Sequence, residues 1–96
     1  WAIDLARHGH QVRLLLEGEA TQCLREREGR FGELFEEART LGLLAGACRA
    51  ASAGCGDAGR EVTGIAQDLG LPLLDTLGGH AGIDPFVREG YEVVTF

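Results

Sequence analysis

One pattern occurs four times along the 96-residue chain and restricts the folds open to it: a helix, then a glycine, then an apolar segment. The glycines are Gly9, Gly42, Gly70 and Gly90. Each stands where a helix ends in a residue of positive φ, which glycine adopts without the steric penalty of a Cβ atom. Strands that alternate with helices at this spacing predict right-handed crossovers and a parallel sheet.

The apolar segments after these glycines predict the strands. They cover residues 11–17, 43–48, 71–74 and 91–96, with extended cores expected at 12–16, 43–47, 73–74 and 92–95. The segment 43–48 is continuously apolar, as is usual for a central parallel strand covered on both faces. We therefore expect all four strands to lie parallel in one sheet, with helices on both faces.

The helices show an apolar stripe with the spacing i, i+3, i+4, i+7. One stripe is Phe31, Leu34, Phe35, Ala38 and Leu41, and the other is Val62, Ile65, Ala66 and Leu69. We also predict a first helix with Leu5 and Ala6 buried, a short helix at 20–27 and a turn at Gly29. Asp84 before Pro85 predicts an N-cap and a helix to residue 89. Because the chain begins within the first helix, we expect a strand to precede it in the natural protein.

Size and charge exclude several classes of protein. The chain is long enough for one domain, residues 1–96. A net charge of −6 and the absence of Lys argue against nucleic acid as a partner, because phosphate binding needs clustered basic residues. The apolar runs are too short to cross a bilayer, and charged residues interrupt the N-terminal ones, unlike a signal peptide. We expect a cytoplasmic protein without a membrane partner.

The chain has three cysteines, Cys23, Cys48 and Cys55. An odd number without a secretion signal favours free thiols over a disulfide framework. The spacing of Cys48 and Cys55 matches no standard zinc pattern, and His8, His10 and His80 have no obvious partner ligands in the sequence. No metal and no organic cofactor are expected. Cys23 is interpreted as incidental, and the histidines beside Gly9 as structural.

Cys48 ends the second predicted strand, at the sheet edge where ligands of parallel sheets bind. A helix N-terminus after such a cysteine favours the thiolate and makes a better nucleophile. Arg49 adds positive charge if its side chain turns inward, and Ser52, Gly54 and Gly56 form a loop whose amides can approach an anion. The alternative is that Cys48 is a small buried hydrophobe.

Two further residues are candidates for an auxiliary role. His80 follows the third strand and is predicted at the same sheet edge as Cys48, where it can lend a proton or a charge. Cys55 is close enough in sequence to act as a resolving thiol for Cys48. The alternative for both is a loop residue without a function.

Three stretches together resemble a known family. They are Gly9-His-Gln-Val-Arg-Leu-Leu-Leu-Glu-Gly18, Leu41-Gly-Leu-Leu-Ala-Gly-Ala-Cys48-Arg-Ala-Ala and Phe86-Val-Arg-Glu-Gly90-Tyr-Glu-Val-Val-Thr-Phe96. The chain resembles the DsrE/DsrF-like family, which includes the TusD-type sulfur carriers, through the order of its elements. The resemblance implies a single α/β domain of three αβα layers, flavodoxin- or Rossmann-like, whose first strand precedes residue 1. It also implies homo- or hetero-oligomers.

In sulfur-relay members of this family, a cysteine just after the third strand, often followed by alanines, accepts persulfide sulfur. Cys48 falls at that position, so the leading hypothesis is a persulfide carrier with a protein donor and a protein acceptor. We then expect iodoacetamide to modify Cys48 ahead of Cys23 and Cys55. Two other hypotheses stay open: a non-catalytic module that binds a small anion or nucleotide with loops 48–59 and 77–84, and a structural subunit of an oligomer.

Overall fold

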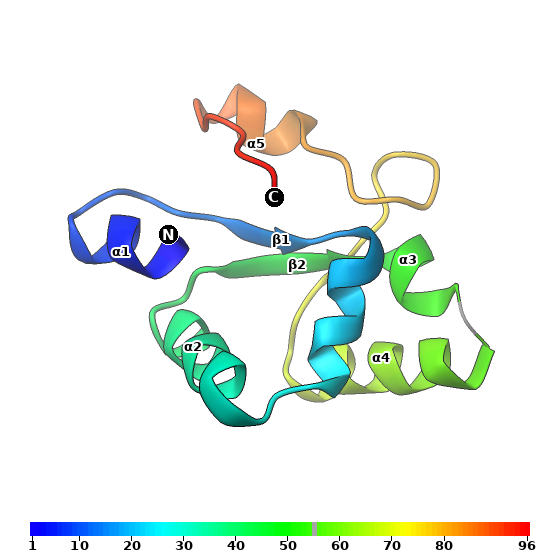
Figure 1. The fold of residues 1–96 in the computed structure, drawn as a ribbon. Coiled ribbons are helices and arrows are strands. Elements are labelled where there is room, and N and C mark those ends of the chain that lie inside the picture. Colours follow the sequence, from blue (N-terminus) through cyan, green and yellow to red (C-terminus); the bar gives the residue numbers. More distant parts are fainter. Residues whose placement is uncertain (55) are drawn as a thin grey trace.

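The computed structural model describes residues 1–54 and 56–96, with side chains at 1–54 and 59–96. The elements, in order, are α1 (Ala2–Arg7), β1 (Leu14–Leu16), the 3-10 helix η1 (Gly18–Arg25), α2 (Gly29–Thr40), β2 (Leu44–Cys48), α3 (Arg49–Ala53), α4 (Gly56–Asp68), β3 (Leu73–Leu74) and α5 (Asp84–Arg88). Figure 1 shows their arrangement. In the described residues the strands form one sheet in the order β1-β2-β3, so β2 is central.

The predicted parallel sheet is confirmed for three strands. β2 pairs in parallel with both β1 and β3. The order of these three strands follows the sequence. The four glycines of the repeated pattern all have positive φ, between 68° and 93°, as their helix-ending role predicts.

The predicted fourth strand, at residues 91–96, is wrong. This segment has no regular secondary structure, and Phe96 is 91% exposed. Its sequence is apolar and β-branched, but a strand also needs a partner. Among the described residues, none of the three strands pairs with this segment.

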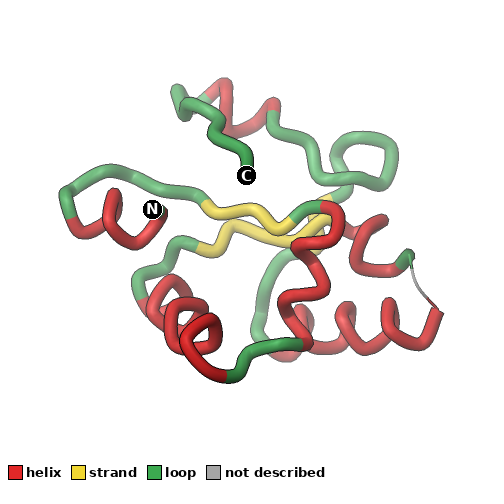
Figure 2. Tube along the Cα trace, viewed as in Figure 1, coloured by secondary structure: helices red, strands yellow, loops and turns green. Residues whose placement is uncertain are grey.

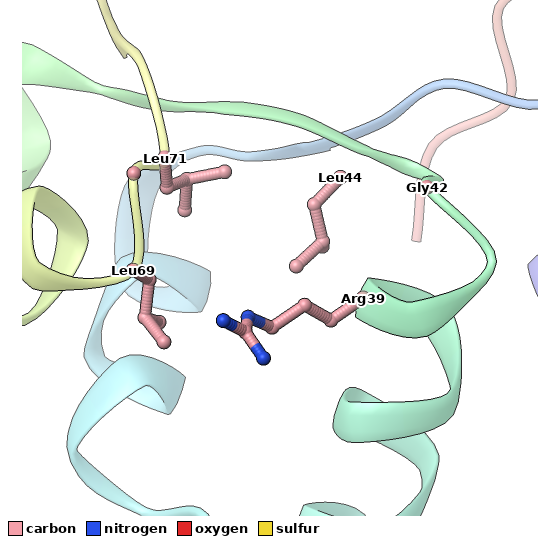
Figure 3. Close-up of a pocket in the computed structure, with 6 residues that line it drawn as sticks. Arg39, Gly42, Leu44, Leu69 and Leu71 are labelled. Atoms are coloured by element: carbon pink, nitrogen blue, oxygen red, sulfur yellow. The ribbon is translucent and has the colours of Figure 1, made fainter.

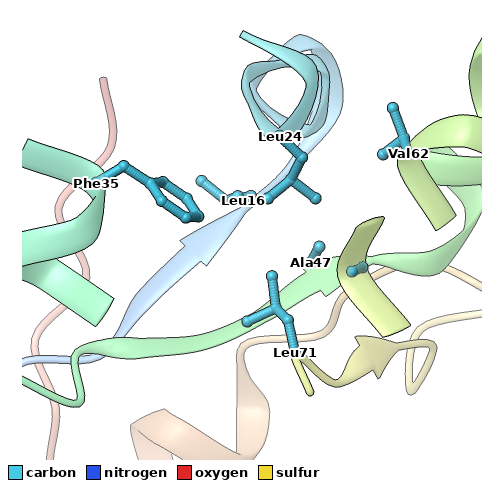
Figure 4. Close-up of a cluster of buried hydrophobic side chains, with 7 residues drawn as sticks. Leu16, Leu24, Phe35, Ala47, Val62 and Leu71 are labelled. Carbon is cyan, nitrogen blue, oxygen red and sulfur yellow. The ribbon is translucent and has the colours of Figure 1, made fainter. Parts of the chain in front are cut away.

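The core lies on one face of the sheet. Right-handed crossover connections that each add the next strand on the same side of the sheet place their helices on one face. Here η1, α2 and α4 lie together below the strands (Figures 1 and 2). Figure 4 shows the side chains that meet there. The buried cluster is Leu16, Leu24, Phe35, Ala47, Val62, Ala66 and Leu71.

An irregularity in β2 sets which side chains face this core. Leu14 pairs with Leu44, but Leu15 pairs with Gly46, so Ala45 is an extra residue in the ladder. Beyond it side chains alternate, as strand geometry requires. Ala47 points into the core cluster. Gly46 and Cys48 therefore point to the opposite face.

The opposite face has a thinner layer. α5 and the C-terminal segment lie above the strands in Figure 1, while α1 lies at one end. Neither helix has a buried residue, and no side chain in residues 75–96 is buried. The prediction that Leu5 packs inside is wrong, since it is 43% exposed on a helix at the margin of the sheet.

Several local predictions need correction. The short helix predicted at 20–27 is the 3-10 helix Gly18–Arg25. The N-cap of α5 is Ile83 rather than Asp84, which is the first residue of the helix and pairs with Arg88 at 2.8 Å. In α2 only the inner part of the predicted stripe, Phe35 and Ala38, is buried. None of the described helices has both the length and the apolar character needed to span a membrane.

Candidate functional site

Three neighbouring strands deliver polar side chains to one edge of the sheet. Glu17 directly follows β1, Cys48 is the last residue of β2, and Asp75 directly follows β3. Parallel strands end at the same edge, so these positions are neighbours although they are far apart in the sequence. The edge is the one at which the sequence predicts a site.

Cys48 is enclosed at this edge. The residue is fully buried, and its Sγ accepts a hydrogen bond from the backbone N–H of Ala81 at 3.4 Å. His80 Nδ1 lies 3.7 Å from the same sulfur. The prediction that His80 shares an edge with Cys48 is confirmed, and the two side chains form a thiol–imidazole pair. The tautomer of His80 decides which atom donates.

A tight turn positions His80. Leu77 and His80 exchange two backbone hydrogen bonds, each 2.9 Å long, across Gly78 and Gly79. Both glycines have positive φ, 55° and 90°, which is the type I′ arrangement. Alanine is strained in this region of φ, and glycine is not. The Gly-Gly pair therefore fixes the direction from which the imidazole approaches the thiol.

Two contacts outside the thiol anchor this turn. Gly79 O accepts a hydrogen bond from the N–H of Ala50, 3.0 Å away at the start of α3. The Arg49 Nε atom donates to Asp75 Oδ2 at 2.9 Å. We call residues 77–81 the cover, because they close over Cys48.

The structure changes two expectations about the thiol. The amide that donates to the sulfur comes from the cover rather than from the helix after Cys48. Arg49 does not turn inward; it pairs with Asp75 on an exposed surface, which satisfies its charge. Cys48 has no exposed surface in this closed arrangement, so iodoacetamide can reach its sulfur only when the cover opens.

The predicted anion-binding loop is mostly helix. Arg49–Ala53 forms α3, Gly54 ends it and Gly56 begins α4. Alanine-rich segments favour helix, and here that preference outweighs the neighbouring glycines. Ser52 is fully buried, and its Oγ has no hydrogen-bond partner among the described residues. It is not at the surface to contact an anion. Cys55 lies outside the described residues.

Glu17 is the residue that sequence analysis missed. Its carboxylate, the Cys48 thiol and a His80 ring nitrogen all lie within 4.8 Å of one another. The histidine that had no partner ligands in the sequence thus has two in the structure. A signal was present: Glu17 is the first polar residue after Leu14–Leu16, the same relation that Asp75 has to β3.

The other candidate residues lie away from this edge. His8 is exposed at the end of α1, where its Nδ1 contacts Asp4 O at 2.8 Å. Cys23 is half-buried in η1. Figure 3 shows a hollow of ≈ 170 Å³ at the amino ends of β2 and β3, lined by Arg39, Gly42, Leu44, Leu69, Gly70 and Leu71. Ligands of parallel sheets bind at the opposite edge.

Comparison of the chain with models of known protein families, with curated proteins and with solved structures found no match. The interpretation of the site therefore depends on its own geometry. That geometry consists of a thiol, an imidazole and a carboxylate at one strand edge, with the thiol under a glycine-based cover.

Proposed function

We propose that this protein is a persulfide carrier of a sulfur relay, with Cys48 as the residue that holds the sulfur. The observation that carries the proposal is the environment of Cys48 Sγ, which has a backbone N–H donor at 3.4 Å and an imidazole nitrogen at 3.7 Å. A base beside a thiol can take its proton as the sulfur attacks, and the thiolate is the nucleophile in sulfur exchange.

The transfer requires no change in oxidation state overall. His80 takes the proton of Cys48, and the thiolate attacks the terminal sulfur of a donor persulfide, R–S–SH. A sulfur–sulfur bond forms at Cys48, and the bond between the two donor sulfurs breaks. The donor leaves as a thiolate and receives the proton from His80. Cys48 then carries –S–SH, and an acceptor thiol removes the terminal sulfur by the same exchange.

The cover gives this chemistry a closed and an open state. In the closed state residues 77–81 exclude water from the sulfur, which protects a bound persulfide from other thiols. Loading and discharge require the cover to lift, which breaks the Ala81 and Gly79 hydrogen bonds; residues 75–96 have no buried side chain that would hold the cover down. Donor and acceptor are proposed to be proteins that bind at this edge, as the resemblance to DsrE-like proteins implies.

Mass spectrometry tests the carrier directly. Metal-free protein is incubated with cysteine persulfide, and we expect it to gain the mass of one sulfur atom at Cys48. Cys48→Ser should abolish the gain, and Cys23→Ser should retain it. Loading that persists in Cys48→Ser, or that never occurs, would overturn the proposal.

A pair of glycine variants tests the cover. Gly79 and Gly90 have nearly the same φ, 90° and 93°, and neither has an atom within 4 Å of an added Cβ. Alanine therefore introduces similar strain at both, about 1–2 kcal/mol, but only Gly79→Ala places it in the cover. We expect Gly79→Ala to raise the rate of Cys48 alkylation by iodoacetamide about 5- to 30-fold. Equal rates in Gly79→Ala and Gly90→Ala would contradict the role of the cover.

A further inference from the structure

The edge that holds Cys48 also brings together three different kinds of metal ligand. A thiol from the end of β2, an imidazole from the cover and a carboxylate from the residue after β1 lie with their ligand atoms within 4.8 Å of one another. Each comes from a different strand or the turn behind it. The fold alone brings these three ligands together, whether or not Cys48 carries a persulfide.

The thiol and the imidazole already have the separation that a tetrahedral metal requires. Bond lengths of about 2.3 Å for Zn–S and 2.0 Å for Zn–N at the tetrahedral angle place the two ligand atoms roughly 3.5 Å apart. Cys48 Sγ and His80 Nδ1 are 3.7 Å apart. Glu17 is exposed, so its side chain is free of packing and can complete the third side of the site.

The charges and the surroundings of the three ligands favour a divalent cation. The Cys48 thiolate and the Glu17 carboxylate together supply two negative charges, which neutralise Zn²⁺. The N–H of Ala81 donates to Cys48 Sγ at 3.4 Å, an outer-shell contact that orients a thiolate ligand. The type I′ turn fixes the backbone of His80 before any metal binds.

From these observations we infer that Glu17, Cys48 and His80 form a zinc site. Sulfur, nitrogen and oxygen donors in one tetrahedral set suit Zn²⁺. Three protein ligands leave the fourth position open to water or to an external ligand, as in zinc sites that bind small molecules. The site shares Cys48 and His80 with the proposed sulfur relay, but the relay needs neither Glu17 nor a metal.

Zinc titration of chelator-stripped protein tests the inference. With a chromophoric chelator as competitor, we expect one Zn²⁺ per chain. Removal of any one ligand, by Cys48→Ser, His80→Gln or Glu17→Gln, should weaken zinc binding. Loss of an outer-shell partner already weakens metal binding about 10- to 100-fold, and loss of a direct ligand should cost no less. Since Glu17 and His80 are exposed, their variants keep the test valid if the core variant Cys48→Ser does not fold. Co²⁺ in place of Zn²⁺ should show thiolate charge-transfer absorption that Cys48→Ser removes.

The double variant His8→Gln/His10→Gln is the matched control, because it removes two exposed imidazoles that precede β1, whereas the site lies after its carboxyl end. It should bind zinc as the unaltered chain does. Absence of stoichiometric binding, binding indifferent to Glu17→Gln and His80→Gln, or equal loss in the control would overturn the inference. Persulfide loading is measured without metal, so failure of the zinc site and failure of the sulfur relay are distinguishable.

Discussion

Gly46 is the position at which one added methyl group should do most harm to the sheet. It lies in β2 two residues before Cys48, on the same face. A Cβ atom there would lie 2.6 Å from Leu74 Cγ, 2.8 Å from Leu74 Cδ1 and 2.8 Å from Pro72 O. Leu74 thus fills the space that the missing side chain leaves. Gly46→Ala sets the methyl group against strand β3.

The magnitude follows from what is able to move. Leu74 can rotate, but Pro72 O accepts the N–H of Ala47 at 2.9 Å, so its displacement weakens the pairing of β2 with β3. Overpacking of this kind destabilises by about 1–3 kcal/mol. For a domain of this size that lowers Tm by about 4–24 °C, at about 4–8 °C per kcal/mol.

Urea unfolding followed by circular dichroism measures the effect, and Gly64→Ala is its control. Gly64 lies inside α4 with nothing within 4 Å of an added Cβ, so alanine there should stabilise by about 0.5–1 kcal/mol. The two Gly-to-Ala changes are therefore expected to have opposite signs. If Gly46→Ala is as stable as the unaltered chain, Leu74 does not occupy the space above Gly46 and the packing argument fails.

Two further predictions concern burial and assembly. Ser52→Ala removes a buried hydroxyl that has no hydrogen-bond partner among the described residues. It should raise the free energy of unfolding by about 1 kcal/mol in the same urea assay. A loss of stability would mean that the hydroxyl is hydrogen-bonded. A small acidic chain with large apolar side chains at the surface, among them Trp1, Leu77 and Val94, is expected to self-associate. Sedimentation velocity at micromolar concentration should show a dimer or larger species, and a clean monomer would contradict this.

The sequence correctly predicted the features of the fold that depend on residue type and on the order of the elements. Gly42 and Gly70 end their helices with positive φ, which follows from the residue type alone, and the parallel pairing follows from the alternation of elements. The segment 91–96 carries an equally good strand pattern. It does not become a strand because a strand needs a pairing partner elsewhere in the chain, which the segment's own sequence does not encode.

Some features of the candidate site could likewise be predicted from the sequence, and others could not. Cys48 and His80 could be placed together because Cys48 ends one predicted strand and His80 follows the next, and parallel strands end at a shared edge. The burial of Cys48 could not be predicted, because it depends on a turn that folds back over the strand end. Glu17 could have been found by applying the strand-end rule to β1 as it was applied to β2.

The absence of buried side chains in residues 75–96 has an energetic consequence. Segments with few buried contacts open locally at a free energy well below that of global unfolding. The buried cluster and the side chains packed against it end at Leu73, so the segment that carries His80 and Ala81 can detach while the sheet and its three covering helices stay folded. Access to Cys48 is then governed by a local equilibrium, which ligands or partners at this edge can shift without altering the stability of the core. The Ala81 N–H donates its hydrogen bond to the Cys48 sulfur, so the hydrogen-exchange rate of this amide reports the local opening equilibrium directly.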